Sequence, residues 1–216
     1  MRMEKKLNEH QKLLKIISEI EEKTPGKKPT LLLHACCAPC SSYVIEFLSL
    51  HFDITIFYYN PNIHPQAEYD RRLDELKKFL TQFPEAVKNS VKLFCGTYNP
   101  EDYFTATNVR IETELQSEKE KGERCRRCYE FRMKRAFEFA VENHFDYFTT
   151  TLSISPHKDS EKINEIGYTL DKLQKIKYLP ADFKKNNGFK RSLELSAEYG
   201  LYRQDYCGCI FSKQNG

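Results

Sequence analysis

Apolar and polar residues follow one another along this chain in blocks that predict helices and strands in turn. Between residues 3 and 20, apolar side chains recur every three or four positions, as on one face of a helix: Met3, Leu7, Leu13, Leu14, Ile17 and Ile20. The run PTLLLHA at 29–35 is continuously apolar, which is typical of a strand that is buried on both faces. Residues 24–29 read as the linker between the two, and residues 41–50 then have the pattern of a helix.

The same alternation continues toward the C-terminus. It predicts further strands at 53–59, 91–95, 145–151 and 176–180, and further helices at 65–83, 123–143, 159–173 and 189–199. Such alternation predicts an α/β fold with a mainly parallel sheet flanked by helices. We expect residues 1–28 to form an amphipathic helix with its linker, and residues 29–216 to form a single α/β domain that carries the functional site. In such sheets, ligands bind beyond the carboxyl ends of the strands.

Composition and charge narrow the class of protein. The 216 residues are 40% hydrophobic and carry a formal net charge of +3, which fits a globular protein. No apolar run approaches the ~20 residues that a membrane-spanning helix needs. The charged N-terminus lacks the apolar core of a secretory signal, so we expect a cytoplasmic protein with no membrane partner. Residues 119–135 hold eight Lys or Arg against three Glu around a CxxC, which favours either a nucleic acid near a metal or a solvated helix face.

Cysteine is the residue type with the most informative distribution. Four groups are present: Cys36, Cys37 and Cys40; Cys95; Cys125 and Cys128; Cys207 and Cys209. Clustered cysteines in a cytoplasmic chain indicate metal binding or redox chemistry. Two sulfurs from the first group and two from the CxxC suit a zinc ion or an iron–sulfur cluster. The adjacent pair favours the cluster, because both sulfurs would have to turn toward one zinc ion. The alternative is that most of these thiols hold no ligand.

The surroundings of the other cysteines suggest separate roles. Arg124, Arg126 and Arg127, with the helix dipole, are expected to lower the pKa of the CxxC thiols. Gly208 permits the bend that a Cys207–Cys209 disulfide requires, and such a strained disulfide would suit an electron relay. The alternative is that these two cysteines are additional metal ligands. Cys95 ends an apolar strand and is predicted to be a buried small hydrophobe.

Three further segments contain residues with possible chemistry. His64 in the loop NPNIHP is a candidate acid, base or ligand, or a simple hydrogen-bonding partner. His157 and Lys158, before a predicted helix, would hold a phosphate or belong to a capped helix start without a ligand. In the C-terminal part, cations and aromatic residues interleave as unpaired nucleotides require, although a core with surface lysines would look the same: Phe183, Lys184, Lys185, Phe189, Lys190, Arg191, Tyr199, Tyr202, Arg203 and Tyr206.

Five motifs in their order along the chain resemble the cobalamin-independent epoxyqueuosine reductase family. They are HACCAPCS, FYYNPNIHPQAEYDRR, GERCRRCYEFRM, TTTLSISPHKD and DFKKNNGFKRSLELSAEYGLYRQDYCGCIFS, and they cover roughly residues 30 to 212. The resemblance implies an oxidoreductase that converts epoxyqueuosine to queuosine at the wobble position of tRNA, the last step of queuosine biosynthesis. It implies tRNA and a separate electron donor as partners, and no cobalamin.

The same resemblance implies roles for individual cysteines. Cys36, Cys37, Cys125 and Cys128 would be the ligands of a 4Fe-4S cluster. Cys207 and Cys209 would form a redox-active pair that becomes a disulfide when oxidised. The family is also expected to hold a second iron beside the cluster, and Cys40 is the candidate ligand for it.

The resemblance also extends to the nucleotide-binding ATP-pyrophosphatase-like (HUP-type) fold. HACCAPCS stands where enzymes of that fold carry their glycine-rich pyrophosphate loop, and it lacks the glycines, so we expect no use of ATP. Two rival functions remain open on the sequence. A zinc-stabilised tRNA-binding module would be colourless and without catalysis. A tRNA sulfur-transfer enzyme would need ATP and carry a persulfide.

Overall fold

A five-stranded, all-parallel sheet forms the centre of the protein, in a computed structural model that describes residues 7–173 and 175–213. The strand order is β3-β2-β1-β4-β5. The strands are β1 Thr30–Ala35, β2 Asp53–Tyr58, β3 Lys92–Cys95, β4 Tyr147–Thr150 and β5 Lys177–Tyr178. The predicted α/β fold with a parallel sheet is confirmed, whereas the resemblance to the HUP-type fold stays a prediction.

Helices connect the strands and flank the sheet. They are α1 Glu9–Lys23, α2 Ala38–Leu48, α3 Gln66–Gln82, α4 Pro84–Lys88, α5 Pro100–Thr107, α6 Glu123–Glu142, α7 Ser160–Asp171 and α8 Gly188–Glu198, with 3-10 turns η1 Thr113–Gln116 and η2 Thr151–Ile154. The predicted helices are present with shifted ends. Helix α2 begins three residues before its predicted start, so Cys40 lies in its first turn. Helices α4 and α5 were not predicted, and Met3 of the predicted first helix lies outside the described residues.

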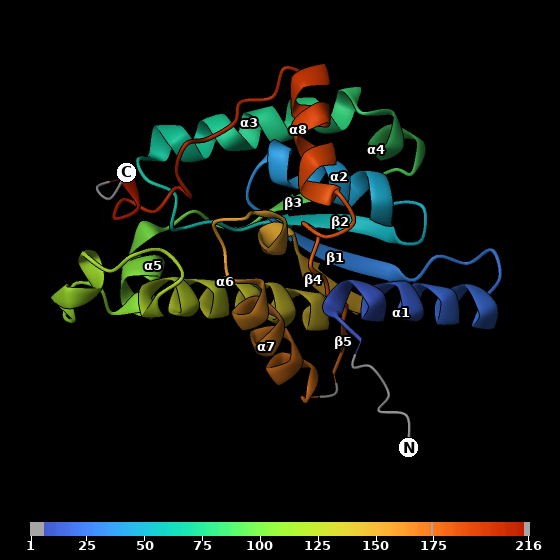
Figure 1. Ribbon diagram of the computed structural model, residues 1–216, viewed down its shortest axis with the longest axis horizontal. Coiled ribbons are helices and arrows are strands. Elements are labelled where there is room, and N and C mark those ends of the chain that lie inside the picture. The colour runs from blue at the N-terminus through green and yellow to red at the C-terminus, as the bar shows by residue number, and fades with distance from the viewer. Residues whose placement is uncertain (1–6, 174, 214–216) are drawn as a thin grey trace.

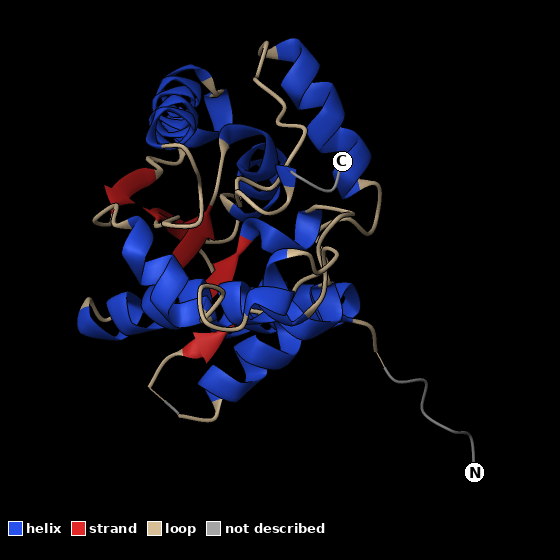
Figure 2. Ribbon diagram, turned by 90° about the vertical axis from the view of Figure 1, so that its left-hand side faces the viewer, coloured by secondary structure: helices blue, strands red, loops and turns tan. Residues whose placement is uncertain are grey.

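The side chains of the central strands alternate between two cores, as the pleat of a strand requires. Leu31 and Leu33 of β1 belong to one cluster of buried residues, with apolar residues of α2, α3 and α8. Leu32 belongs to the other, with residues of α6 and α7. Figure 1 accordingly shows α3 and α8 on one side of the sheet and α6 and α7 on the other, and Figure 2 shows the strands between helices. Burial on both faces explains why the strand sequences are continuously apolar.

Helix α1 packs against the first of these cores. It begins with a capping box, in which the Asn8 side chain accepts a hydrogen bond from the Gln11 N–H and the Gln11 side chain accepts one from the Asn8 N–H. Leu13 and Ile17 of α1 are buried in the same cluster as the strand residues of β1 and β2. Among the described residues, no helix is both long enough and apolar enough to span a bilayer.

The strand order locates the place where a ligand would bind. The chain runs outward from β1 to β2 and β3, and then continues on the other side of β1 with β4 and β5. In such a sheet the crevice lies beyond the carboxyl ends of the two strands at which the order reverses, here β1 and β4. Cys36 follows β1 directly, and the segment that ends in His157 and Lys158 follows β4 and η2.

Candidate functional site

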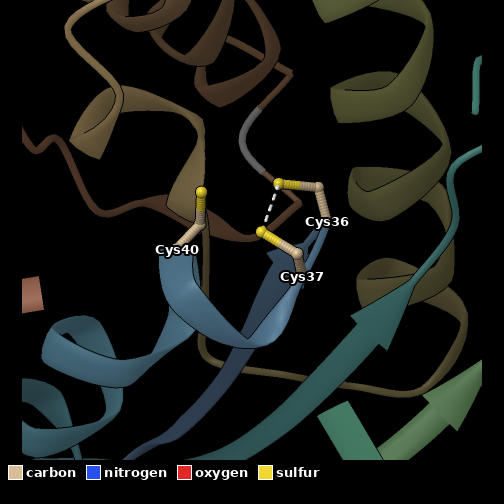
Figure 3. A group of neighbouring side chains, drawn as sticks. All are labelled: Cys36, Cys37 and Cys40. Atoms are coloured by element: carbon tan, nitrogen blue, oxygen red, sulfur yellow. Dashed lines mark hydrogen bonds between the residues drawn. The ribbon is translucent and has the colours of Figure 1, made fainter. Parts of the chain in front are cut away.

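Three thiols meet where β1 passes into α2. Strand β1 ends at Ala35, Cys36 follows, and Cys37 is the extended residue that precedes the first turn of α2. The Sγ atoms of Cys36 and Cys37 are 3.8 Å apart, and together with that of Cys40 they all lie within 4.8 Å of one another. Figure 3 shows the sulfurs of Cys36 and Cys37 facing each other, with Cys40 on the neighbouring turn of the helix. This thiol trio is a compact set of soft ligands for a metal.

The three thiols of the trio differ in their pKa values. Hydrogen bonds from Cys37 and Cys40, followed by the nearby cations Lys158 and Arg132, hold the pKa of Cys36 well below its usual range. The contact with Cys36 has the opposite effect on the other two thiols. It raises the pKa of Cys37 and, for Cys40, raises the pKa to about 12. The surroundings therefore favour ionisation of Cys36 over ionisation of Cys37 or Cys40.

A second pair of thiols lies at the start of α6. The Glu118 carboxylate accepts hydrogen bonds from the N–H groups of Glu123 and Arg124, both at 2.7 Å, and so caps the helix that carries Cys125 and Cys128. Cys128 is buried and Cys125 is half-buried. Both thiols line a small cavity between α5, α6 and the C-terminal segment.

The expectation that the pKa values of the CxxC thiols are lowered is wrong, although Arg124 acts on Cys125 in the expected direction. Burial raises the pKa of Cys125 and raises that of Cys128 to about 11. Arg126 pairs with Glu123 and Glu130, and Arg127 pairs with Glu112 and Glu123, so both guanidinium groups are directed to carboxylates. The guanidinium of Arg124 donates to the carbonyl oxygens of Leu115 and Gln116.

The third group is the CGC sequence, which the chain holds in a sharp bend. Gly208 has a φ of +100°, so the bend expected from its conformational freedom is present. All eight cysteines are free thiols in the structure, Cys207 and Cys209 among them. The Cys209 N–H donates to Cys207 Sγ at 3.4 Å, and the Cys209 thiol lies 3.0 Å from the Tyr103 hydroxyl.

Buried Arg72 of α3 holds this bend in place. Its guanidinium donates to the carbonyl oxygens of Tyr206 and Cys207, each at 3.3 Å, and pairs with Glu68 at 2.7 Å. Arg72 is 2% exposed, and burial without these acceptors would be costly for a charged group. The C-terminal segment is thereby attached to α3.

Two adjoining cavities bring the three thiol groups into one region. The larger, of about 780 Å³, is lined by the thiol trio and by Cys207. The smaller is lined by Cys125, Cys128, Cys207 and Cys209. Four residues line both cavities: Glu120, His157, Lys158 and Cys207. Cys207 is thus the thiol common to the two cavities.

Two cations lie among these thiols. Arg132 is 3% exposed and donates to the Cys128 carbonyl oxygen at 3.4 Å and to Asn60 Oδ1 at 3.2 Å. Burial by itself would lower the pKa of Lys158, yet that pKa is raised, because negative charge on the nearby sulfurs, Cys36 first, stabilises its charged form. The site therefore combines anionic sulfur with fixed positive charge.

Some of the other residues singled out from the sequence lie outside the two cavities or have a structural role. His64 lies outside the lining of both cavities; its Nδ1 lies 2.9 Å from the Asn62 carbonyl oxygen, and its ring packs against Phe104. The Asp159 carboxylate caps α7 through the N–H groups of Glu161 and Lys162, so the capped helix start is present. Cys95 is exposed, so its predicted burial is wrong: it ends β3, which lies at the edge of the sheet.

The C-terminal cations and aromatic residues divide between cleft, core and surface. Phe189, Arg203 and Tyr206 line the larger cavity, whereas Phe183 is buried in the core. Lys184 pairs with Asp182, and Arg191 pairs with Glu46. Four residues that surround the thiols were not singled out from the sequence, because only the packing of separate segments shows that they line these cavities: Arg72, Tyr103, Glu120 and Arg132.

Comparison with known proteins gives a consistent result. A family model described as epoxyqueuosine reductase QueH matches residues 31–215. The chain is 42% identical over 212 residues to the epoxyqueuosine reductase QueH of Streptococcus pyogenes serotype M1, covering 98% of this chain and 80% of that protein. It is 42% identical over 207 residues to the protein of that name from Staphylococcus epidermidis, covering 96% and 85%. A third, from Thermotoga maritima, is 33% identical over 189 residues, covering 85% and 90%.

Proposed function

Because this chain belongs to the epoxyqueuosine reductase QueH family and is therefore an oxidoreductase, we propose that it removes the epoxide oxygen of epoxyqueuosine at the wobble position of tRNA. The product is the alkene of queuosine. Two electrons and two protons enter, and the oxygen leaves as water. The names of the relatives support this reaction over both a tRNA-binding module without catalysis and a sulfur-transfer enzyme.

The geometry of the larger cavity supports a nucleic-acid substrate. Its rim carries exposed Lys119, Lys121 and Arg203, which suit the phosphates of an anticodon loop. Phe189 and Tyr206 offer aromatic faces against which an unpaired base would stack. The thiol trio lies on the lining of the same cavity, so a base held there is close to the sulfurs. We place the reaction in the cytoplasm, where tRNA is processed.

The thiols fit an iron–sulfur centre by their chemistry. The trio offers three convergent sulfurs with no carboxylate or imidazole among them, and Cys125 and Cys128 supply two more on the adjoining cavity. Following the family resemblance, we assign Cys36, Cys37, Cys125 and Cys128 to a 4Fe-4S cluster. Cys40 is assigned to a second iron. A bound 4Fe-4S cluster supplies one-electron transfer.

The protein's own residues would prepare the substrate for reduction. The larger cavity holds the base, and the cations Lys158 and Arg132 stabilise negative charge that arrives at the sulfurs. Glu120, His157 and Lys158 line both cavities and carry exchangeable protons, so they replace His64 as candidate donors to the epoxide oxygen. The Cys207–Cys209 dithiol stores two electrons, which is the number that the reaction consumes.

The test begins with protein purified without oxygen. We expect brown protein with about four sulfides and at least four irons per chain. Cys36→Ser and Cys125→Ser should lose iron and sulfide together, whereas Cys95→Ser, which changes an exposed cysteine on the edge strand, should keep both. The iron-loaded protein should convert tRNA that carries epoxyqueuosine when dithionite supplies electrons. Zinc without sulfide after reconstitution would overturn the cluster, and an inactive iron-loaded protein would overturn the reaction.

A further inference from the structure

The two sulfurs of the CGC sequence lie in different surroundings. Cys207 is half-buried and lines both cavities, so a reagent in the larger cavity reaches its sulfur. Cys209 is 5% exposed and lines only the smaller cavity. A disulfide between them would therefore present one accessible sulfur and one enclosed sulfur.

The enclosed sulfur has a dedicated hydrogen-bond partner. Tyr103 of α5 is 1% exposed, and its hydroxyl oxygen lies 3.0 Å from Cys209 Sγ. Cys209 and Tyr103 belong to one small buried cluster with Val109, Leu115, Cys128 and Phe211. Because these surroundings are mainly apolar, a charge on Cys209 would depend on the hydroxyl donor.

The accessible sulfur, that of Cys207, has a backbone N–H and a serine hydroxyl as neighbours instead of a tyrosine. Cys207 Sγ accepts from the Cys209 N–H at 3.4 Å and lies 3.3 Å from Ser212 Oγ. The Ser212 hydroxyl donates its proton to the Cys209 carbonyl oxygen at 2.8 Å. With these contacts in place, Cys207 lines the larger cavity as well as the smaller one.

Building on the proposed redox role of this pair, we propose that Cys207 is the sulfur at which electrons enter, and that Tyr103 stabilises Cys209 as the leaving sulfur. A thiolate of a dithiol reductant attacks Cys207 Sγ of the disulfide. The Cys207–Cys209 bond breaks, and its electron pair goes to Cys209 Sγ, which accepts the Tyr103 hydrogen bond. The second thiol of the reductant then attacks the mixed disulfide and releases Cys207. The reductant becomes a disulfide, and its two electrons and two protons remain on the pair.

The first experiment tests which sulfur is attacked. Iron-loaded Cys209→Ser and Cys207→Ser proteins are treated with 5,5′-dithiobis(2-nitrobenzoate), and the tryptic peptide 204–213, which contains both positions, is followed by mass spectrometry. We expect Cys209→Ser to form a mixed disulfide at Cys207 at least about tenfold faster than Cys207→Ser forms one at Cys209. Equal rates, or a faster reaction at Cys209, would overturn the assignment of the entry sulfur.

The second experiment tests Tyr103. The Tyr103→Phe variant keeps the buried ring and removes the hydroxyl. We expect dithiothreitol to reduce its Cys207–Cys209 disulfide about tenfold more slowly, because a hydrogen bond to a charged sulfur is lost. Tyr98→Phe is the matched control, since the Tyr98 hydroxyl donates to the Ile63 carbonyl oxygen and not to a sulfur.

The outcomes separate this inference from the function on which it rests. Failure of the unmodified protein to form a Cys207–Cys209 disulfide on oxidation would overturn the relay and the inference together. If the disulfide forms and dithiothreitol reduces it at the same rate in Tyr103→Phe as in the Tyr98→Phe control, the role of Tyr103 alone would be overturned.

Discussion

The backbone N–H of His64 donates a hydrogen bond to the carbonyl oxygen of Gly208 at 2.8 Å. This contact joins the loop that follows β2 to the bend between Cys207 and Cys209. The approach is close: a Cβ atom at Gly208 would lie 2.8 Å from Ile63 Cγ1 and 3.3 Å from Ile63 Cα. The position of both CGC sulfurs therefore depends on a residue without a side chain.

Substitution of Gly208 should consequently impair the enzyme. Gly208→Ala places a Cβ at a φ of +100° and against Ile63, so we expect the bend to shift and reductase activity to fall about tenfold or more. Gly200→Ala is the matched control, because Gly200 also has a positive φ but nothing lies within 4 Å of its Cβ position. Steady-state rates of both variants test this prediction, and equal rates would contradict it.

Removal of the Cys40 thiol should separate the proposed second iron from the cluster. Cys40 is half-buried on the first turn of α2, whereas Cys36 and Cys37 are almost fully buried. We expect Cys40→Ser to keep about four irons and four sulfides per chain and to lose any iron beyond these. Metal and sulfide analysis measures both. Loss of sulfide, as in Cys36→Ser, would instead make Cys40 a cluster ligand.

Helix α1 should contribute measurably to stability. Leu13 is fully buried in the core that the sheet forms with α2, α3 and α8, so Leu13→Ala should lower the free energy of unfolding by about 2–5 kcal/mol. The adjacent Leu14 is 44% exposed, and Leu14→Ala should cost less than about 1 kcal/mol. Urea denaturation of both variants makes the comparison. Similar losses would show that α1 does not pack as described.

His34 should make the fold sensitive to acid. It is fully buried between Thr150 and the Tyr59 carbonyl oxygen, and burial, with Arg132 adding to it, lowers the pKa of its ring to about 3. The unfolded chain takes up a proton at His34 near pH 6.5, and the folded chain does not, so stability is present above that pH and is lost as the pH falls. From pH 7.5 to 5 the loss should be about 2 kcal/mol. Urea denaturation of wild-type and His34→Gln proteins measures this difference, and identical pH dependences would refute it.

The sheet was readable from the sequence because its strands are buried on both faces. Runs such as PTLLLHA are mainly apolar and carry no formal charge at neutral pH, and the charged helices between them complete the pattern. Helix α5, at Pro100–Thr107, was missed because eight residues carry too little periodicity to be distinguished from a loop. Cys95 was misjudged for a related reason: its strand reads as apolar, but position at the edge of the sheet is a property of strand order, which the sequence pattern does not contain.

The site was predictable in its cysteines and not in their surroundings. The spacing of the thiols, and their place directly after a buried strand, can be seen from residues that are neighbours in the sequence. Arg72 and Tyr103 are recognisable only once the chain is folded, because each contacts a cysteine from a distant part of the chain or its carbonyl oxygen. The arginines beside the CxxC misled because Arg126 and Arg127 pair with glutamates, and because the burial that raises the pKa of both thiols depends on the folded chain.

The attachment of the C-terminal segment by Arg72 has a consequence for biosynthesis. Translation delivers the thiol trio first, then Cys125 and Cys128, and the CGC bend last of all. Until the carbonyl oxygens of Tyr206 and Cys207 reach the Arg72 guanidinium, one wall of the larger cavity is missing. On a nascent chain that still lacks this segment, the thiol trio and the thiols of α6 face an open cavity, and the CGC segment closes it.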